Sequence, residues 1–257
     1  MLAELLELAP SGVEQVEGDG FVEFALYGAP GELPAFPDGE VSVGGAIVRV
    51  RGEQVPDDWA ERWKAFHQPV LVAPRSGGSA PAVWIRPPWV AAREGALDIV
   101  VDPGQAFGTG AHPTTRLSLE LLLGLRVRGS LADLGCGSGV LAIAAAMLGF
   151  APVVAVDNEL AALDATRANA SVNGAQLDRV ERVNLRDEAP PRAETIVANL
   201  VRPLLLDVAE RMGDARPGAL IVSGLLDAEA DEVAAAFAPL TERERRSEQG
   251  WTALLLR

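Results

Sequence analysis

The chain has 257 residues, 49% of them apolar, which is enough for one sizeable α/β domain and a small second one. A formal net charge of −14 argues against direct nucleic-acid binding, which requires a basic surface. The absence of a long apolar run, of a basic signal segment and of a second cysteine excludes a membrane span, a targeting peptide and an intrachain disulfide, so we expect a cytoplasmic protein.

Residues 1–52 indicate a small α+β domain. Gly and Pro are concentrated in the middle of this segment, which marks a long loop between its strands. The expected elements, in chain order, are a helix at Leu2–Leu8, strands at Val13–Val16 and Phe21–Tyr27, a loop at Gly28–Gly39 and a strand at Val41–Val50.

The charge of this first segment is one-sided. Residues 1–48 contain nine acidic side chains and no Lys or Arg. One interpretation is a solubilising surface, because net charge acts first on solubility. The other is a docking surface for a basic macromolecule, because complementary charge speeds encounter. On the second interpretation, the domain recognises a protein substrate.

Residues 53–70 are expected to form a linker helix. Trp59, Trp63 and Phe66 recur at helical spacing in Asp57–Phe66 and form one apolar stripe, which is typical of packing against a larger domain. A Ser/Gly/Pro-containing insert at Pro74–Pro81 and a strand at Ala82–Arg86 follow. We therefore place a second domain at residues 71–257.

Strands and helices alternate over most of the second domain, and the chain closes with an antiparallel hairpin. This order predicts a doubly wound sheet with ligands at the carboxyl ends of its strands. The expected strands are Ser130–Leu134, Val153–Val156, Val180–Val183, Thr195–Ala198 and Ala219–Val222, the helices are Thr115–Leu125, Val140–Leu148, Leu160–Val172, Val201–Met212 and Ala228–Phe237, and the hairpin is Glu242–Arg246 with Trp251–Leu256.

The stretch Leu131–Gly139 has the pattern of a nucleotide-binding turn. Glycine lets the backbone approach a ligand, and the N–H groups of the following helix face an anion. Asp133 precedes the turn, and Asp157 ends the next strand, where a carboxylate can bind both ribose hydroxyls. The G-x-G-x-G spacing resembles the first motif of class I methyltransferases, which bind S-adenosylmethionine, and its glycines are Gly135, Gly137 and Gly139.

A second motif, Asp102–Thr115, narrows the resemblance. Three glycines within seven residues predict a loop that closes over a ligand, and Pro113 with two threonines marks the start of a helix. His112 in this loop is either a base or a structural hydrogen-bonding group. Together with Leu131–Gly139 and Ile196–Leu200, the motif is similar to the ribosomal protein L11 methyltransferase (PrmA) family from about Gly12 to Arg257.

This resemblance implies a Rossmann-like class I methyltransferase that transfers methyl groups from S-adenosylmethionine to lysine and N-terminal amines of a basic ribosomal protein. Asn199 would orient the amine, although an amide before a helix is also a natural cap. The implied cofactor-binding residues are Phe107, Thr109, Thr115, Asp133, Gly135, Gly137, Asp157 and Asn199, and the implied catalytic residues are Asn199 and Thr109.

No metal is expected in this chemistry, because the methyl group on the sulfonium is already activated. Three alternatives stay open. The first is a lysine methyltransferase acting on another protein, such as the β subunit of electron-transfer flavoprotein. The second is a nicotinamide-dependent dehydrogenase, which the glycine spacing disfavours. The third is a binding protein without catalysis.

Overall fold

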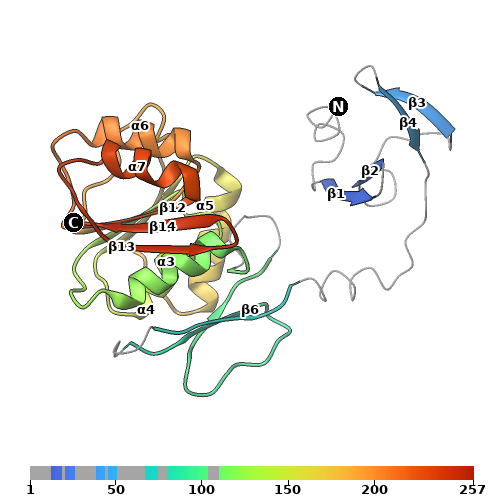
Figure 1. Ribbon diagram of the computed structural model, residues 1–257. Coiled ribbons are helices and arrows are strands. Elements are labelled where there is room, and N and C mark those ends of the chain that lie inside the picture. The colour runs from blue at the N-terminus through green and yellow to red at the C-terminus, as the bar shows by residue number, and fades with distance from the viewer. Residues whose placement is uncertain are drawn as a thin grey trace. The chain divides into compact units, whose positions relative to one another are not determined.

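Two units divide the chain, Met1–Arg62 and Trp63–Arg257 (Figure 1). The computed structural model describes residues 13–18, 21–26, 39–43, 46–50, 67–74, 80–103 and 110–257. The division between the units falls inside the predicted linker. The expected helices at Leu2–Leu8 and Asp57–Phe66 lie outside the described residues, so the α+β character of the first unit stays a prediction.

The described part of the first unit consists of two antiparallel strand pairs. β1 (Val13–Gly18) pairs with β2 (Phe21–Leu26), as expected. β3 (Gly39–Val43) pairs with β4 (Ala46–Val50), which corrects the prediction of one continuous strand from Val41 to Val50. The sequence carries Gly44–Gly45 between them, and a Gly-Gly pair between two apolar runs is a hairpin signal that outweighs β-propensity.

A three-stranded sheet opens the described part of the second unit. β5 (Val70–Val72) lies antiparallel to β6 (Val83–Arg86), and β6 lies parallel to β7 (Leu97–Val100). The sequence analysis identified only the middle strand. β5 has just three residues, too few for a clear alternation of apolar and polar side chains.

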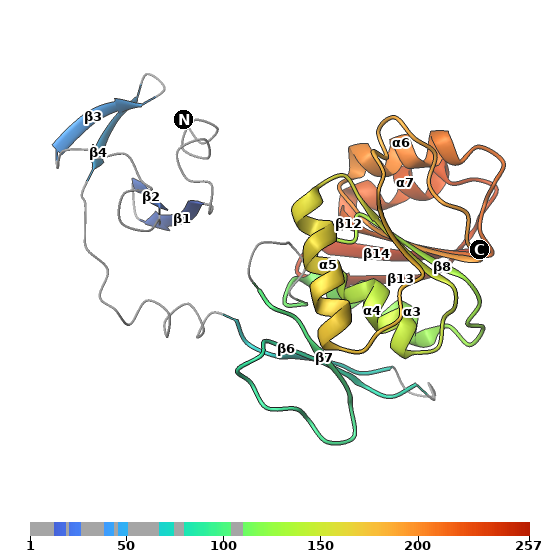
Figure 2. The same cartoon turned by 180° about the vertical axis from the view of Figure 1, so that it is seen from behind.

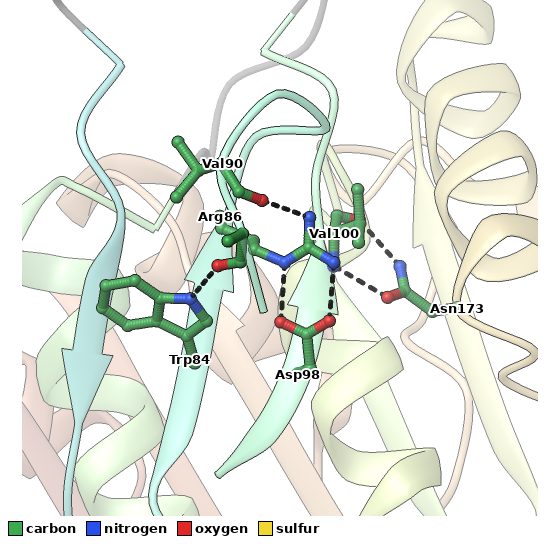
Figure 3. Close-up of polar contacts among 7 residues, drawn as sticks. Trp84, Arg86, Val90, Asp98, Val100 and Asn173 are labelled. Carbon is green, nitrogen blue, oxygen red and sulfur yellow. Dashed lines mark hydrogen bonds and ion pairs between the residues drawn. The ribbon is translucent and has the colours of Figure 1, made fainter. Parts of the chain in front are cut away.

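An ion pair joins β6 to β7. Arg86 Nε and Nη2 each donate to a carboxylate oxygen of Asp98 at 2.8 Å, and Nη1 donates to the Val90 carbonyl at 2.6 Å (Figure 3). The hydrogen bonds that the guanidinium donates to Asp98 raise the pKa of Arg86 above its ordinary value. With side-chain exposures of 14% for Arg86 and 29% for Asp98, the pair is largely withdrawn from water. Such a bidentate, charge-assisted contact fixes the register of the two strands.

The residue that follows helix α5 (Leu160–Val172) pairs with the outer edge of β7. The amide of Asn173, the residue after this helix, accepts from Val100 N at 2.8 Å and donates to Val100 O at 2.7 Å (Figure 3). One side chain thereby makes both hydrogen bonds that a neighbouring strand would make. The outward backbone groups of Val100 are thereby satisfied, and the small sheet is attached to the end of α5.

The second, larger sheet has seven strands in the order β10-β9-β8-β11-β12-β14-β13. Within this sheet only β14 runs against the other strands, and it pairs antiparallel with both β12 and β13. This topology confirms the predicted doubly wound sheet with a terminal hairpin. The bounds are β8 Leu131–Leu134, β9 Val153–Asp157, β10 Arg179–Arg182, β11 Thr195–Asn199, β12 Ala219–Leu226, β13 Glu242–Glu248 and β14 Trp251–Leu256.

Helices cover both faces of the large sheet (Figures 1 and 2). α3, α4 and α5 lie on one face, and α6 and α7 lie on the other. The three-stranded sheet packs on the same face as α3 and α4. The remaining bounds are α3 Pro113–Gly124, α4 Val140–Met147, α6 Arg202–Met212, α7 Ala230–Ala236 and a single 3-10 turn at Asp227–Glu229.

Alternate residues of the central strands enter the two cores. In β9, Val153 and Ala155 join the core under α3 and α4, whereas Val154 and Val156 join the core under α6 and α7. Strands buried on both faces need continuous apolar runs, which is why these strands were recognisable in the sequence. Within the described residues, no helix is both long and apolar enough to cross a membrane.

Removing Asp98 tests the contribution of the β6–β7 ion pair to stability. We expect Asp98→Ala to lower the free energy of unfolding by about 2 kcal/mol, because it leaves the largely buried Arg86 guanidinium unpaired. The matched control is Asp164→Ala, which breaks an exposed pair with Arg167 and should cost less than about 0.5 kcal/mol. Urea unfolding measures both values, and equal costs would contradict this assignment.

Candidate functional site

A cleft of about 340 Å³ lies at the carboxyl ends of the parallel strands. Its position is the one expected for a doubly wound sheet, where the strand order reverses between β8 and β11. Five chain segments form its wall. The lining residues are Thr115; Gly135–Gly137 with Val140 and Leu141; Asp157–Glu159 with Ala162; Val183–Arg186; and Asn199, Leu200 and Leu204.

The turn after β8 needs its glycines. Gly135, Gly137 and Gly139 have φ values of +71°, +54° and +80°, a region that other residues enter only with strain. A Cβ on Gly139 would lie 2.9 Å from two side-chain atoms of Thr166, so space is limiting as well. The N–H groups of Gly135 and Cys136 donate to Val156 O at 2.8 and 3.0 Å, which fastens the turn to β9.

Asp157 stands at the end of β9 with its carboxylate already oriented. Oδ2 accepts from the N–H of Gly137 at 3.0 Å, and Oδ1 accepts from the N–H of Glu159 at 3.0 Å. Each oxygen keeps a second lone pair for another donor. The carboxylate therefore lines the cleft with a free lone pair on each oxygen, and its contact with a ribose stays a prediction.

Asp133 lies behind the cleft wall and does not line it. Its side chain is 1% exposed, and Oδ2 accepts from Ala142 N at 3.0 Å. Oδ1 has no hydrogen-bond partner. Burial raises the pKa of this carboxyl to about 7, while the Ala142 hydrogen bond lowers it and the charge of Asp157 adds to the rise. Asp133 thus binds the first turn of α4 from inside, and its predicted contact with the cofactor stays a prediction.

Cys136 is a buried, unreactive member of the turn. It is 6% exposed, and the Thr166 hydroxyl lies 3.3 Å from its sulfur. Burial raises the pKa of the thiol to about 12, and the negative charge of Asp133 adds to this effect. A thiol that stays protonated at neutral pH is a small core residue and not a nucleophile.

Helix α3 brings Thr115 to the cleft and fixes it there. His112 caps the helix: its Nδ1 lies 2.8 Å from Thr114 Oγ1, and its ring packs edge-on against Trp251 at 5.0 Å. Burial and the neighbouring Arg116 lower the pKa of His112. The sequence left two roles open for His112, a base or a structural hydrogen-bonding group. These contacts favour the structural role.

Asn199 ends β11 and lies beside Thr115 in the cleft, with Nδ2 3.5 Å from Thr115 Oγ1. The predicted site residues Thr115, Gly135, Gly137, Asp157 and Asn199 therefore share one wall. Helix α6 begins after Val201, which is its N-cap residue, and the cap has no side-chain hydrogen bond. The Asn199 amide therefore does not cap this helix.

Phe107 and Thr109 lie outside the described residues, so their assignment stays a prediction. The structure adds a segment that the sequence analysis passed over, Val183–Arg186, which follows β10 and lines the cleft. The expected strand at Val180–Val183 could have indicated this segment. β10 runs parallel to β9, so the residues that follow it reach the same edge of the sheet as Asp157. Arg186 adds a positive charge to the cleft wall, and the sequence pattern around Asp157 could not predict it.

Comparison with known proteins identifies the family. The family model "Ribosomal protein L11 methyltransferase (PrmA)" matches residues 41–257. The chain belongs to this family. It is 41% identical over 220 residues to the ribosomal protein L11 methyltransferase of Pseudomonas aeruginosa strain LESB58, covering 81% of this chain and 70% of that one.

Two further relatives agree. The Azotobacter vinelandii enzyme of the same name is 40% identical over 223 residues, covering 82% of this chain and 72% of that protein. The crystal structure of a ribosomal protein L11 methylase from Lactobacillus delbrueckii subsp. bulgaricus superimposes with a TM-score of 0.61 at 27% identity, covering 68% of this chain and 93% of that one.

The PrmA-family chain is accordingly a methyltransferase, and S-adenosylmethionine is its methyl donor. The relatives support the ribosomal-protein interpretation, and nothing in them favours the flavoprotein or dehydrogenase alternatives. Among the described residues, no group of three or more His, Cys, Asp or Glu side chains is arranged to hold a metal ion.

The raised pKa of Asp133 predicts a pH-dependent stability in the absence of cofactor. Because this pKa is about 7 in the folded protein against an ordinary 3.8, the folded state keeps a proton that the unfolded state loses. The contribution of Asp133 is most favourable below pH 4 and declines by about 4 kcal/mol as the pH rises through 7.

Asp133→Asn should abolish this decline, since asparagine can still accept from Ala142 N but does not ionise. We expect the unfolding free energies of variant and parent to diverge between about pH 4 and pH 7, with the variant becoming relatively more stable. The exposed control Asp164→Asn should follow the parent. Parallel curves for Asp133→Asn and the parent would contradict the raised pKa.

Proposed function

We propose that this protein transfers methyl groups from S-adenosylmethionine to lysine side chains and the N-terminal amine of ribosomal protein L11. Family membership supports the ribosomal protein as substrate. The observation that supports an amine acceptor is the Asn199 amide, which stands on the cleft wall beside Thr115 without being used as a helix cap.

The cleft fits the cofactor in volume and in donor set. Its volume of about 340 Å³ lies in the range of small-molecule sites. In our assignment, Asp157 accepts from the two ribose hydroxyls and Thr115 donates to the methionine carboxylate. Gly135 and Gly137 admit the backbone close to the methionine portion, because neither carries a Cβ. Asp133 acts on the cofactor through the start of α4, where it accepts from Ala142 N.

Phe107 and Thr109 complete the proposed set. They belong to the same motif as His112, which caps α3, and Thr115, which lines the cleft. Gly110 has φ +87°, and a Cβ there would lie 2.8 Å from Ile85 Cδ1. A glycine is therefore required where this motif rejoins the three-stranded sheet. We assign Phe107 to cofactor contact, and Thr109 to both cofactor contact and catalysis.

When bound, the cofactor supplies a methyl group on a positively charged sulfur. The protein must then present an uncharged amine. A lysine with a pKa of about 10.4 is neutral roughly once in a few thousand molecules at pH 7, which costs about 4–5 kcal/mol. A cleft that excludes water lowers that pKa, and the Asn199 carbonyl oxygen can accept an amine hydrogen to direct the lone pair.

The first unit is proposed to recognise the protein substrate. Its first 48 residues carry nine acids and no base, whereas ribosomal proteins are typically basic. Opposite charge speeds encounter and loses its effect as salt rises, because the Debye length falls from about 10 Å at 0.1 M to about 3 Å at 1 M. Neither the cofactor nor the chemistry requires this unit.

Substitution of Asp157 tests the cofactor assignment. Asp157→Ala should weaken S-adenosylhomocysteine binding at least about tenfold, because it removes two charge-assisted hydrogen bonds worth about 1.5–3 kcal/mol each. Calorimetry gives the affinity, and the exposed carboxylate variant Asp164→Ala is the control. Unchanged affinity in Asp157→Ala, or NAD binding as tight as S-adenosylhomocysteine, would overturn the assignment.

Charge removal in the first unit tests substrate recognition. With Glu14, Glu17 and Glu23 replaced by Gln, the KM for ribosomal protein L11 should rise roughly threefold or more at low salt. Affinity for S-adenosylhomocysteine should not change. Tritium transfer from S-adenosylmethionine to purified ribosomal protein L11 measures the KM, and the effect should shrink at high salt.

The matched control removes the same number of charges from the second unit, at the exposed positions Asp164, Glu210 and Asp214. An equal rise in KM in the control would mean that net charge matters and the first unit does not. A chain beginning at Glu53 should still bind S-adenosylhomocysteine while methylating ribosomal protein L11 poorly. Methylation as fast as in the full chain would leave the first unit as a solubilising surface.

A further inference from the structure

Leu200, the residue after Asn199, lies between two glycines, one in the turn after β8 and one in β12. A Cβ on Gly135, after β8, would lie 2.3 Å from Leu200 Cδ2. A Cβ on Gly224, in β12, would lie 2.3 Å from Leu200 O and 2.8 Å from its carbonyl carbon. Atoms do not approach so closely, so any other residue at either position would displace Leu200.

The backbone of Leu200 is fixed by β12. Asn199 pairs with Ser223 in the parallel ladder, and Leu200 N then donates to Ser223 O at 3.1 Å. Immediately afterwards the β12–β14 register shifts between Val222 and Leu225, and Gly224 has φ +85°. The irregularity leaves room for the Leu200 carbonyl, and bulges of this kind commonly re-aim groups beside active sites.

The side chain of Asn199 has little else to orient it. Among the described residues, its hydrogen-bond partner is the Thr115 hydroxyl, at the long distance of 3.5 Å. The direction of the amide therefore depends on the backbone that carries it, and this backbone is fixed at the next residue. Leu200 itself reaches the cofactor turn through its side-chain contact with Gly135.

We propose that Leu200 is a positioning residue for methyl transfer: enclosed by Gly135 and Gly224, it sets the direction of the Asn199 amide relative to the cofactor turn. This inference rests on the proposed role of Asn199 in orienting the amine. It assigns Leu200 no contact with the reacting atoms. Its effect should appear in turnover more than in cofactor affinity, because a small misplacement of a reacting group slows chemistry strongly.

The test compares Leu200→Ala with Leu200→Met in the full chain. Leu200→Ala should lower kcat on ribosomal protein L11 about tenfold or more while the Kd for S-adenosylhomocysteine stays within about threefold. Leu200→Met, which keeps the volume, should retain most of the parent's kcat. Leu206→Ala removes a partly buried leucine of α6 that does not line the cleft, and it should leave kcat nearly unchanged.

The two glycines give an independent readout. Gly135→Ala meets the end of the Leu200 side chain, whereas Gly224→Ala meets its backbone, and both positions have a positive φ. Adding Leu200→Ala should therefore restore part of the S-adenosylhomocysteine affinity lost in Gly135→Ala. The same addition should restore no kcat to Gly224→Ala, because alanine keeps the backbone atoms.

An unchanged kcat in Leu200→Ala, or a loss of kcat matched by an equal loss of cofactor affinity, overturns the positioning role. The side-chain amide signals of Asn199 in nitrogen-15 NMR spectra of the S-adenosylhomocysteine complex separate this inference from the proposed function. If the parent does not methylate ribosomal protein L11, the proposed function fails. The positioning role is then decided by whether these signals shift in Leu200→Ala and stay in place in Leu206→Ala.

Discussion

The turn between β8 and α4 is the constraint on which the cleft depends, because its backbone must bend sharply while its polar groups stay satisfied. Helix α5 satisfies them from behind. The Thr166 hydroxyl donates to Gly137 O at 3.0 Å, and Asn169 Nδ2 donates to Ser138 O at 2.8 Å. These two hydrogen bonds hold two carbonyls of the turn in place, and such preorganisation lowers the cost of binding a ligand.

The same helix ties the turn to the small sheet. Asn169 Oδ1 accepts from Asp102 N at 3.2 Å, so one buried amide joins the glycine turn to the segment that leads into the second motif. One turn of helix later, Asn173 pairs with Val100. At the other end of that motif, Arg116 forms an ion pair with Glu248 at 2.6 Å and also donates to Ala111 O. Both ends of the motif are thus attached to rigid elements.

Much of this arrangement could be predicted from the sequence, for identifiable reasons. The central strands are apolar on both faces, and the glycine spacing with Asp157 placed the cleft at the correct edge of the sheet. The β3–β4 hairpin differs from the predicted single strand because apolar residues continue on both sides of the Gly-Gly pair. The site roles themselves, and the functions of Phe107 and Thr109, remain predictions.

Other features depend on contacts that no local pattern records. Asn173 and Val100 are separated by 73 residues, and local periodicity carries no information about their pairing. The position of Leu200 likewise depends on two glycines that lie far away on either side in the sequence. Alternation and spacing predict which elements form and which edge they share, but they cannot predict which side chains meet once the elements pack.

The buried state of Cys136 has a practical consequence. It is the sole cysteine of the chain, its side chain is 6% exposed, and its thiol has a pKa of about 12. Maleimide reagents react with thiolates, so the native protein should be almost inert to them at neutral pH. A cysteine introduced at an exposed position such as Val127, which is 73% exposed, would then take up a fluorophore selectively, with no need to replace the native residue.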